Sequence, residues 1–234
     1  MSGDGAGRTA IVTGASRGLG FELAKALAER GWRLVIDGRE SGPLREATAE
    51  LRDRTEVVAI PGDVSRDRHR RDVIERAGDP IHLLVNNASV LGPSPQPALA
   101  DYPLAELAHV YAVNVFAPLA LAQLALPRMA EGAVILNLTS DAGAEAYEGW
   151  GGYGSSKAAL EQLSAILAAE HPELRIYAVD PGDMRTRMHQ EAFPGEDISD
   201  RPPPAESVPG LLELVEGELP SGRYRAADLA KVPA

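Results

Sequence analysis

The feature that most constrains the fold is a set of short apolar runs in which polar and apolar residues do not alternate. Strands exposed on one face show alternation, whereas strands of a parallel sheet covered on both faces are apolar throughout. Helix-length segments separate the runs. This order predicts an α/β fold with a doubly wound parallel sheet of six to seven strands and helices on both faces. The predicted strands are residues 9–14, 33–36, 56–60, 81–87, 133–138 and 174–180, with 222–227 as a seventh candidate.

The segments between these runs carry helix signals. Leu19, Leu23 and Leu27 recur every four residues, which places them on one face of a helix that Gly31 would end. The charged stretch 66–72 is expected to form the exposed face of a helix. Further helices are expected over 43–53, over about 104–129 with a kink at Pro118, from near Gly152, and over 206–217.

Composition narrows the classes of function. The chain has no cysteine, which excludes disulfides, thiolate metal sites and a cysteine nucleophile, and fits a cytoplasmic location. A net charge of -11 without a long basic run argues against nucleic-acid binding. No apolar run approaches the roughly 18 residues of a membrane helix, and no secretion signal is expected. The five histidines show no metal-ligand cluster, so no metal site is predicted.

A glycine-rich turn, TGASRGLG at residues 13–20, follows the first strand and opens the first helix. Gly14, Gly18 and Gly20 permit a tight turn and let the backbone approach a pyrophosphate at the helix N-terminus. The same letters fit G-x-S-x-G, the nucleophile elbow of hydrolases. A hydrolase would have strands before its elbow, and neither His171 nor His189 has a recognisable catalytic setting. The turn therefore favours a dinucleotide site.

The tip of the second predicted strand, IDGRE, bears on which nicotinamide cofactor is bound. An acidic residue there holds the ribose 2′-hydroxyl of NAD, whereas arginine accommodates the 2′-phosphate of NADP. Asp37 could be that acid, but Gly38 is the residue expected to face the ribose, and Arg39 follows it. Arg17 in the glycine turn supplies a second guanidinium. This pattern favours NADP, while the alternative is that both arginines are solvated and Asp37 selects NAD.

The stretch YGSSKAAL places Tyr153 four residues before Lys157 at the head of a predicted helix, and therefore on the same face. A phenol has a pKa of about 10, and a neighbouring cation is expected to lower it toward the working pH, where acid–base catalysis is most effective. By itself such a pair would more often be an amphipathic surface pair. Tyr147 and Trp150, which precede it, are candidates for stacking on a substrate ring.

Taken in order, these motifs resemble the short-chain dehydrogenase/reductase family from Thr9 to about Thr186, and the resemblance implies a Rossmann-type fold. Ser140 stands thirteen residues before Tyr153, as the family serine does, and Ser89 replaces a usual glycine. The matching segments are TGASRGLG (13–20), Asp63-Val64, NNAS (86–89), AVNVF with Asn114, LNLTS with Ser140, YGSSK (153–157) and PGDMRT (181–186).

The resemblance implies an oxidoreductase that interconverts a carbonyl and an alcohol on a small organic substrate by hydride transfer. Tyr153 would exchange the proton, Ser140 would hydrogen-bond the same oxygen, and Lys157 would tune Tyr153 and bind the nicotinamide ribose. Asn114 would hold a water that links Lys157 to solvent. The implied cofactor contacts are Gly14, Ser16, Arg17, Gly18, Leu19, Gly20, Gly38, Arg39, Asp63, Val64, Asn87, Ala88, Ser89, Tyr153, Lys157, Pro181, Gly182, Met184 and Thr186.

Plain structural roles stay open for several of these residues. Ser140 could cap local backbone, Asn114 could bond to main chain, and Asn86 could bridge strands. Asp63 could cap a turn or helix, and Thr186 could cap a helix.

Residues 1–234 are expected to form one dinucleotide-binding and catalytic domain, with a flexible tail at 1–7 and a substrate loop with short helices over about 184–217. The family implies a homodimer or homotetramer formed through the helices that begin near Leu104 and Gly152. A small-molecule carbonyl or alcohol is the expected partner. The alternative function is a regulator on the same fold that binds NADP(H) without turnover.

Overall fold

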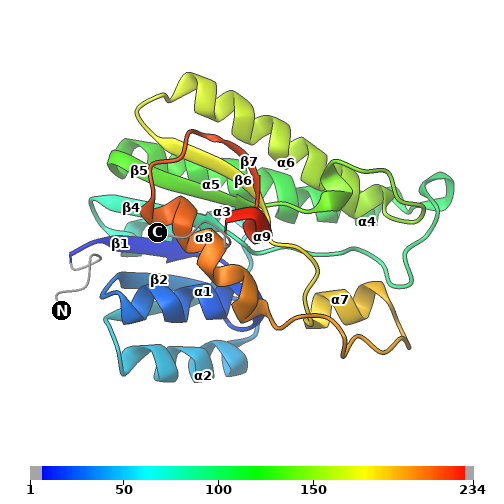
Figure 1. Ribbon diagram of the computed structural model, residues 1–234, viewed down its shortest axis with the longest axis horizontal. Coiled ribbons are helices and arrows are strands. Elements are labelled where there is room, and N and C mark those ends of the chain that lie inside the picture. The colour runs from blue at the N-terminus through cyan, green and yellow to red at the C-terminus, as the bar shows by residue number, and fades with distance from the viewer. Residues whose placement is uncertain (1–6, 230–234) are drawn as a thin grey trace.

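Seven strands form one parallel sheet in the order β3-β2-β1-β4-β5-β6-β7 (Figure 1). The computed structural model describes residues 7–229, so the expected tail at 1–7 lies outside the described residues except for Gly7. The chain order reverses between β1 and β4, and ligands bind at the carboxyl ends of strands beside such a switch point. The strands are β1 (Thr9–Val12), β2 (Arg33–Gly38), β3 (Val57–Pro61), β4 (Ile81–Asn86), β5 (Met129–Leu138), β6 (Arg175–Asp180) and β7 (Gly222–Arg225).

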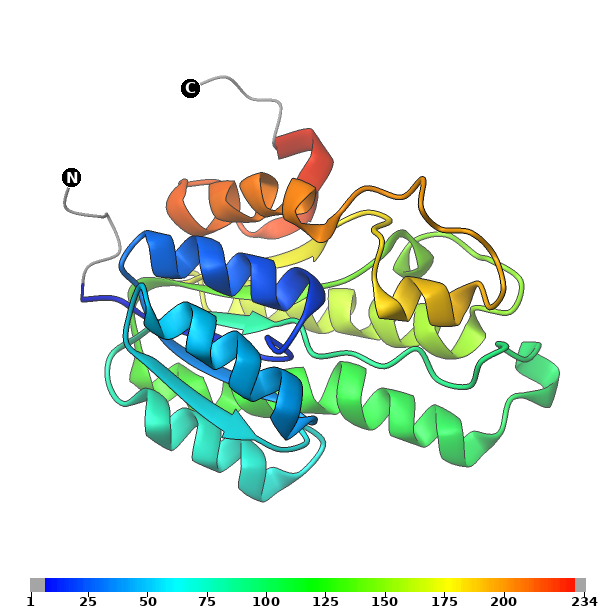
Figure 2. The ribbon, with the colours of Figure 1, turned by 90° about the horizontal axis from the view of Figure 1, so that it is seen from below.

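Helices cover both faces of this sheet, as the sequence predicted (Figures 1 and 2). One face carries α1 (Gly18–Glu29), α2 (Ser41–Arg52) and α8 (Val208–Glu216), and the other carries α3 (Asp67–Ala77), α5 (Ala117–Ala125) and α6 (Gly151–Glu170). Consecutive strand residues belong to opposite layers: Val12 packs in the first and Ile11 in the second, and both are fully buried. Both faces of the strands are therefore apolar, which explains why the runs do not alternate.

The segment predicted as one helix over 104–129 is divided. It consists of α4 (Leu104–Tyr111), a π-helical turn (Ala112–Phe116), α5 and a 3-10 turn, and β5 already begins at Met129. The irregularity lies at 112–116, in the turn directly before Pro118. Pro118 has no N–H to donate to a carbonyl of that turn, which fits a break in the regular helix there.

Contrary to expectation, the stretch Leu104–Arg128 is long and apolar enough to cross a membrane, with 25 residues and a hydropathy of 1.6. It packs here against α3 and α6, and half of its most apolar window is buried, as in a core helix.

Two other expectations change. The predicted substrate loop over 184–217 is two different parts. Its first part holds α7 (Arg187–Ala192), which lies beyond the carboxyl ends of the strands, whereas α8 packs on α1 and belongs to the core (Figure 2). In α3, Asp67 and Arg71 are exposed as predicted for 66–72, but His69 is buried. The last helix, α9 (Ala226–Leu229), follows β7 directly.

Candidate active site

A cavity of about 710 Å³ opens at the carboxyl ends of the strands, between the glycine turn and the start of α6. It brings together residues that lie far apart in the sequence, from Gly14 to Thr186. Gly20 and Asn114 are the predicted site residues that are not part of its wall. The predicted residues that line it are Gly14, Ser16, Arg17, Gly18, Leu19, Gly38, Arg39, Asp63, Val64, Asn87, Ala88, Ser89, Ser140, Tyr153, Lys157, Pro181, Gly182, Met184 and Thr186.

The glycine turn requires glycine for two physical reasons. Gly14 has a φ of 66° and Gly18 a φ of 60°, both in the left-handed region that favours glycine. A Cβ on Gly20 would clash with the side chain of Asn87. That side chain in turn donates from Nδ2 to the carbonyl oxygens of Thr13, at 2.8 Å, and Gly14, at 3.1 Å. Gly20 thus serves the packing of the turn against the end of β4, which is why it does not line the cavity.

Asp37 supports the turn from below. Its side chain is 2% exposed, and its Oδ1 accepts the Gly14 N–H at 2.6 Å. Its Oδ2 lies 2.9 Å from Nε2 of His69. Each oxygen therefore already has one partner, and a ribose hydroxyl would bind Asp37 only in addition to these contacts. His69 was not among the predicted residues, although its four-residue spacing to Val73, and from Val73 to Ala77, marks it as part of the buried face of α3.

The tip of β2 is small and flanked by cations. A Cβ on Gly38 would lie 3.0 Å from Oγ of Ser16, so the two residues form a tight floor between Arg17 and the exposed Arg39. Glu40, which was not among the predicted residues, lies beside these cations. Its Oε1 is 2.7 Å from Nη2 of Arg17 and 3.3 Å from Nη1 of Arg187. The hydrogen bond with Arg17 and the charge of that residue lower the pKa of the Glu40 carboxyl. One exposed carboxylate thus bridges the glycine turn and α7.

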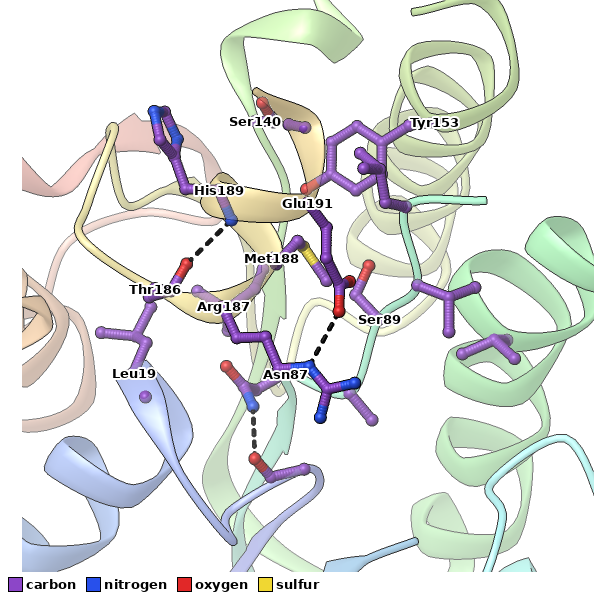
Figure 3. Close-up of a pocket in the computed structure, with 18 of the residues that line it drawn as sticks. Leu19, Asn87, Ser89, Ser140, Tyr153, Thr186, Arg187, Met188, His189 and Glu191 are labelled. Carbon is purple, nitrogen blue, oxygen red and sulfur yellow. Dashed lines mark hydrogen bonds and ion pairs between the residues drawn. The ribbon is translucent and has the colours of Figure 1, made fainter. Parts of the chain in front are cut away.

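Tyr153 and Lys157 stand on one face of the first turns of α6, as predicted. They are 8% and 3% exposed, and Nζ of Lys157 lies 5.3 Å from the centre of the Tyr153 ring. Nζ donates to the carbonyl oxygen of Leu138, at the end of β5, at 2.8 Å. Figure 3 shows Tyr153 reaching into the pocket from α6, together with Ser140 and Ser89. The pair is therefore buried at the cavity and is not a solvated surface pair.

Burial governs the proton affinities of this pair. It raises the pKa of the Tyr153 phenol, the charges of Asp180 and Asp141 raise it further, and the hydroxyls of Ser89 and Ser140 lower it. Burial also lowers the pKa of Lys157 to about 7. The lysine charge was expected to lower the tyrosine pKa. The pKa of Tyr153 is raised instead, because burial disfavours the charged form of both groups. The phenol is held protonated, which is the form that donates a proton.

Ser140 and Asn114 also fill the structural roles that stayed open. Oγ of Ser140 donates to Oδ1 of Asp141 at 2.8 Å and accepts the Ala142 N–H at 3.2 Å. Asn114 is 1% exposed, and its side-chain amide makes all four of the hydrogen bonds it can make. The bonding atoms are Ser89 Oγ, Val90 N, Val90 O and Ser156 Oγ, at 2.9–3.0 Å. The side-chain amide is fully used in fixing the loop after β4, so the expected relay water would have to bind the main chain of Asn114.

Three more predicted residues have structural partners. Asp63 accepts the Ser65 N–H at 2.8 Å, and Thr186 caps α7 by accepting the His189 N–H at 3.2 Å. Asn86 bridges two strands, since its Nδ2 donates to Oδ1 of Asn137 at 2.7 Å. Within residues 7–229, no histidine makes a hydrogen bond to Ser16, so the nucleophile-elbow interpretation lacks its base.

An apolar wall surrounds Tyr153. Leu91, Ala142 and Tyr153 form a buried cluster against which Trp150, Met188 and Ala192 pack. The ring of Trp150 lies 5.9 Å from that of Tyr153 and 6.0 Å from that of Phe193. Tyr147, the other stacking candidate, bonds instead to Asp141 and Glu145. Met188 and Ala192, on α7, were not predicted individually, because the sequence of this segment carries no pattern that fixes its docking (Figure 3).

Comparisons with known proteins agree with this geometry. The family model described as short chain dehydrogenase matches residues 8–197. An NADPH-dependent aldehyde reductase-like protein of Arabidopsis thaliana is 33% identical, over 95% of this chain and 84% of that protein. A rhamnolipid-biosynthesis 3-oxoacyl-[acyl-carrier-protein] reductase of Pseudomonas aeruginosa is 32% identical, over 94% and 84%. A Shigella flexneri structure complexed with NADP superposes with a TM-score of 0.88 at 25% identity, covering 97% of this chain and all of that one (100%).

Proposed function

The chain belongs to the short-chain dehydrogenase/reductase family, and from this premise we propose that it is an NADP(H)-dependent oxidoreductase interconverting a carbonyl and an alcohol. The observation that carries the proposal is the meeting of Tyr153, Ser140 and Lys157 in the cavity whose other end is the glycine turn. The glycine turn suits a pyrophosphate, because it presents backbone N–H groups at the start of α1. The bound nicotinamide supplies or accepts the hydride.

The chain's own residues handle the proton. For reduction, Tyr153 donates its phenolic proton to the substrate oxygen, which becomes the alcohol hydroxyl once the carbon has received hydride. Ser140 hydrogen-bonds the same oxygen after its hydroxyl turns away from Asp141. Lys157 then supplies positive charge beside the phenolate that remains, at the observed 5.3 Å from the ring. Alcohol oxidation is the reverse.

A tyrosine substitution tests this assignment. Tyr153→Phe keeps the ring and removes the proton, so turnover with an aldehyde or ketone should fall by about 10³-fold or more. NADPH binding, measured by isothermal titration calorimetry, should be retained. Tyr147→Phe is the matched control, since Tyr147 is 42% exposed and does not line the cavity, and it should keep its activity. Undiminished turnover in Tyr153→Phe would rule out the phenol as the proton donor.

The preference for NADP rests on the tip of β2. Arg17 and Arg39 flank Gly38, and Asp37 is occupied by Gly14 and His69. The Arabidopsis relative is named as NADPH-dependent, and the Shigella structure contains NADP.

Arg39→Ala should weaken NADPH binding by about 10–100-fold, because it removes a charge-assisted contact worth about 1.5–3 kcal/mol, and should leave NADH binding nearly unchanged. Calorimetry with both cofactors measures this difference. Arg45→Ala, an exposed arginine of α2 outside the cavity wall, is the control. Equal losses for NADPH and NADH would contradict the assignment.

The wall formed by Leu91, Trp150 and Met188 suits an uncharged, apolar group beside the substrate carbonyl. A panel of neutral carbonyl compounds monitored by NADPH absorbance would separate this enzyme from a regulator that binds NADP(H) without turnover. The comparisons give that alternative no support. The proposal further includes a homo-oligomer and a cytoplasmic location, the latter from the absence of cysteine in the sequence.

A further inference from the structure

A group of charged side chains lies directly behind Tyr153 and Lys157. Glu161 stands one helical turn after Lys157 in α6, and Arg223 comes from β7, the edge strand of the sheet. Nε of Arg223 lies 3.0 Å from Oε1 of Glu161. Its Nη2 donates to the carbonyl oxygen of Ser140 at 3.3 Å and lies 3.8 Å from Oδ2 of Asp180. One guanidinium therefore joins the last strand to Ser140 and to the helix that carries Lys157.

The two carboxylates of this group are covered, whereas the guanidinium lies at the surface. The side chains of Glu161 and Asp180 are 16% and 7% exposed, and that of Arg223, on the edge strand, is 31% exposed. Oε1 of Glu161 also accepts the hydroxyl of Thr139, the residue before Ser140, at 2.6 Å. Glu161 is thus fixed by two partners and cannot swing into solvent without breaking both bonds.

Several charged groups face the tyrosine–lysine pair. Glu161 belongs to the same helix, Asp141 to the turn after β5, and Asp180 to the end of β6. The cations from β7 are Arg223 and Arg225, and Nε of Arg225 lies 3.7 Å from Oδ2 of Asp180. On α4, Glu106 and His109 line the same cavity.

Two opposing effects set the pKa of Lys157. Burial lowers the pKa of Lys157 to about 7, and the charge of Glu161 opposes this effect. A modest electrostatic change near Lys157 therefore alters its charge at neutral pH.

We propose that Glu161 and Arg223 form a positioning pair that sets the charge of Lys157. Glu161 stabilises the ammonium, and Arg223 limits this effect by neutralising Glu161 and Asp180. The inference rests on the proposed role of Lys157 in the reaction. It predicts that removing Glu161 and removing Arg223 shift the pKa of Lys157 in opposite directions. Glu161→Gln keeps an oxygen for Thr139 and Arg223 but removes the negative charge, so Lys157 should lose its proton more easily. Arg223→Gln leaves Glu161 without its cation and Asp180 with Arg225 alone, so Lys157 should hold its proton more tightly.

The test is an NMR titration of the full chain labelled with [13Cε]lysine, whose signal reports the charge of each ammonium. The chain has three lysines, Lys25, Lys157 and Lys231, and Lys25→Arg and Lys231→Arg assign the signals. The Lys157 midpoint should fall by about one pH unit in Glu161→Gln and rise by about one in Arg223→Gln. The double variant should return close to the wild type, and the Lys25 midpoint should not move.

Conservative variants separate charge from packing. Glu161→Asp and Arg223→Lys keep the charges, so their midpoints should stay near that of the wild type even where the fold is loosened. The pH at which kcat changes with the charge of Lys157 should move in the same direction as the midpoint. An unmoved midpoint in both glutamine variants, or movement in the same direction in both, would overturn the inference. If one glutamine variant fails to fold, the direction of the Lys157 midpoint shift in the other variant decides.

Failure of this inference is distinguishable from failure of the proposed function. If Tyr153→Phe and Lys157→Met are inactive while the Lys157 midpoint does not move in the glutamine variants, the proposed function is supported and the positioning pair is refuted. If Tyr153→Phe remains fully active while the midpoints move as expected, the pair still sets the lysine charge but the proposed reaction is wrong.

Discussion

Asp37 shows how one buried carboxylate at the wall of the cavity shapes the glycine turn. Its two oxygens bind the Gly14 N–H and the His69 ring, so the first glycine of the turn is held from β2 and, through the histidine, from α3. An unpaired buried polar group is expensive, because its hydration is lost and nothing replaces it. Removing this carboxylate would leave two such groups.

We therefore expect Asp37→Ala to lower the free energy of unfolding by about 2–4 kcal/mol and to weaken NADPH binding. Urea denaturation measures the first effect and calorimetry the second. Asp53→Ala, at an exposed aspartate after α2, should change stability by less than about 0.5 kcal/mol. Similar stabilities for the two variants would show that the hydrogen bonds of Asp37 do not stabilise the protein to this extent.

The sequence was a good guide to residues whose role depends on near neighbours. The glycine turn and the Tyr153–Lys157 spacing are local patterns, and the cavity brings both together as predicted. Contacts between side chains far apart in the sequence could not be predicted. His69 is 32 positions from Asp37, and Arg223 is 62 positions from Glu161. Which charge meets which is decided by the order of the strands, so these partners emerged only from the structure.

At the scale of elements, the start of α6 is set by its glycines. A Cβ on Gly154 would lie 2.5 Å from the carbonyl oxygen of Ala142, and one on Gly152 would clash with the phenol of Tyr102. The absence of side chains at these positions lets α6 approach the turn after β5. That approach places Tyr153 beside the loop that carries Ser140.

Gly154→Ala should consequently destabilise the protein by about 1–3 kcal/mol, although alanine is the better helix former by about 1 kcal/mol. Turnover should also fall, because the helix must shift away from Ser140. Gly42→Ala, in α2, is the matched control: no atom lies within 4 Å of its Cβ, so stability should be unchanged or slightly higher. Thermal unfolding measures the stability of the two variants, and kcat measures their turnover. A Gly154→Ala protein as stable and active as Gly42→Ala would contradict the packing argument.

Element boundaries followed the sequence except where tertiary contacts take over. The order, type and approximate extent of the strands were predictable from apolar runs. The π-helical turn at 112–116 was not, because it coincides with Asn114, whose amide bonds to the loop after β4. The early start of β5 at Met129 was hidden by the helical pattern that precedes it.

At the scale of the whole molecule, large apolar side chains remain exposed on the outer helices. Leu104, Phe116 and Ile166 are 78%, 59% and 44% exposed, on α4, the π-helical turn and α6. Exposed apolar side chains mark an interface where they form a contiguous patch. They lie on the helices through which the proposed homo-oligomer would form.

Phe116→Glu should therefore convert the proposed oligomer to a smaller species, because a charge would be buried at the contact. Size-exclusion chromatography with light scattering measures the mass. Leu99→Glu introduces the same charge at a residue that is 63% exposed but lies in the 3-10 turn before α4, and it should leave the mass unchanged. If both variants keep the mass of the wild type, these helices are not the interface.

The strand order also bears on how the chain is made. After β1, each of β2 and β3 adds to one edge of the sheet, and each of β4 to β7 then adds to the other edge in turn. A ribosome thus delivers the strands in the sequence in which the growing sheet can accept them, and no later strand has to insert between two already paired. The half with the glycine turn can assemble while synthesis continues. The half with the acid–base machinery gains the guanidinium of Arg223 only when the final strand emerges.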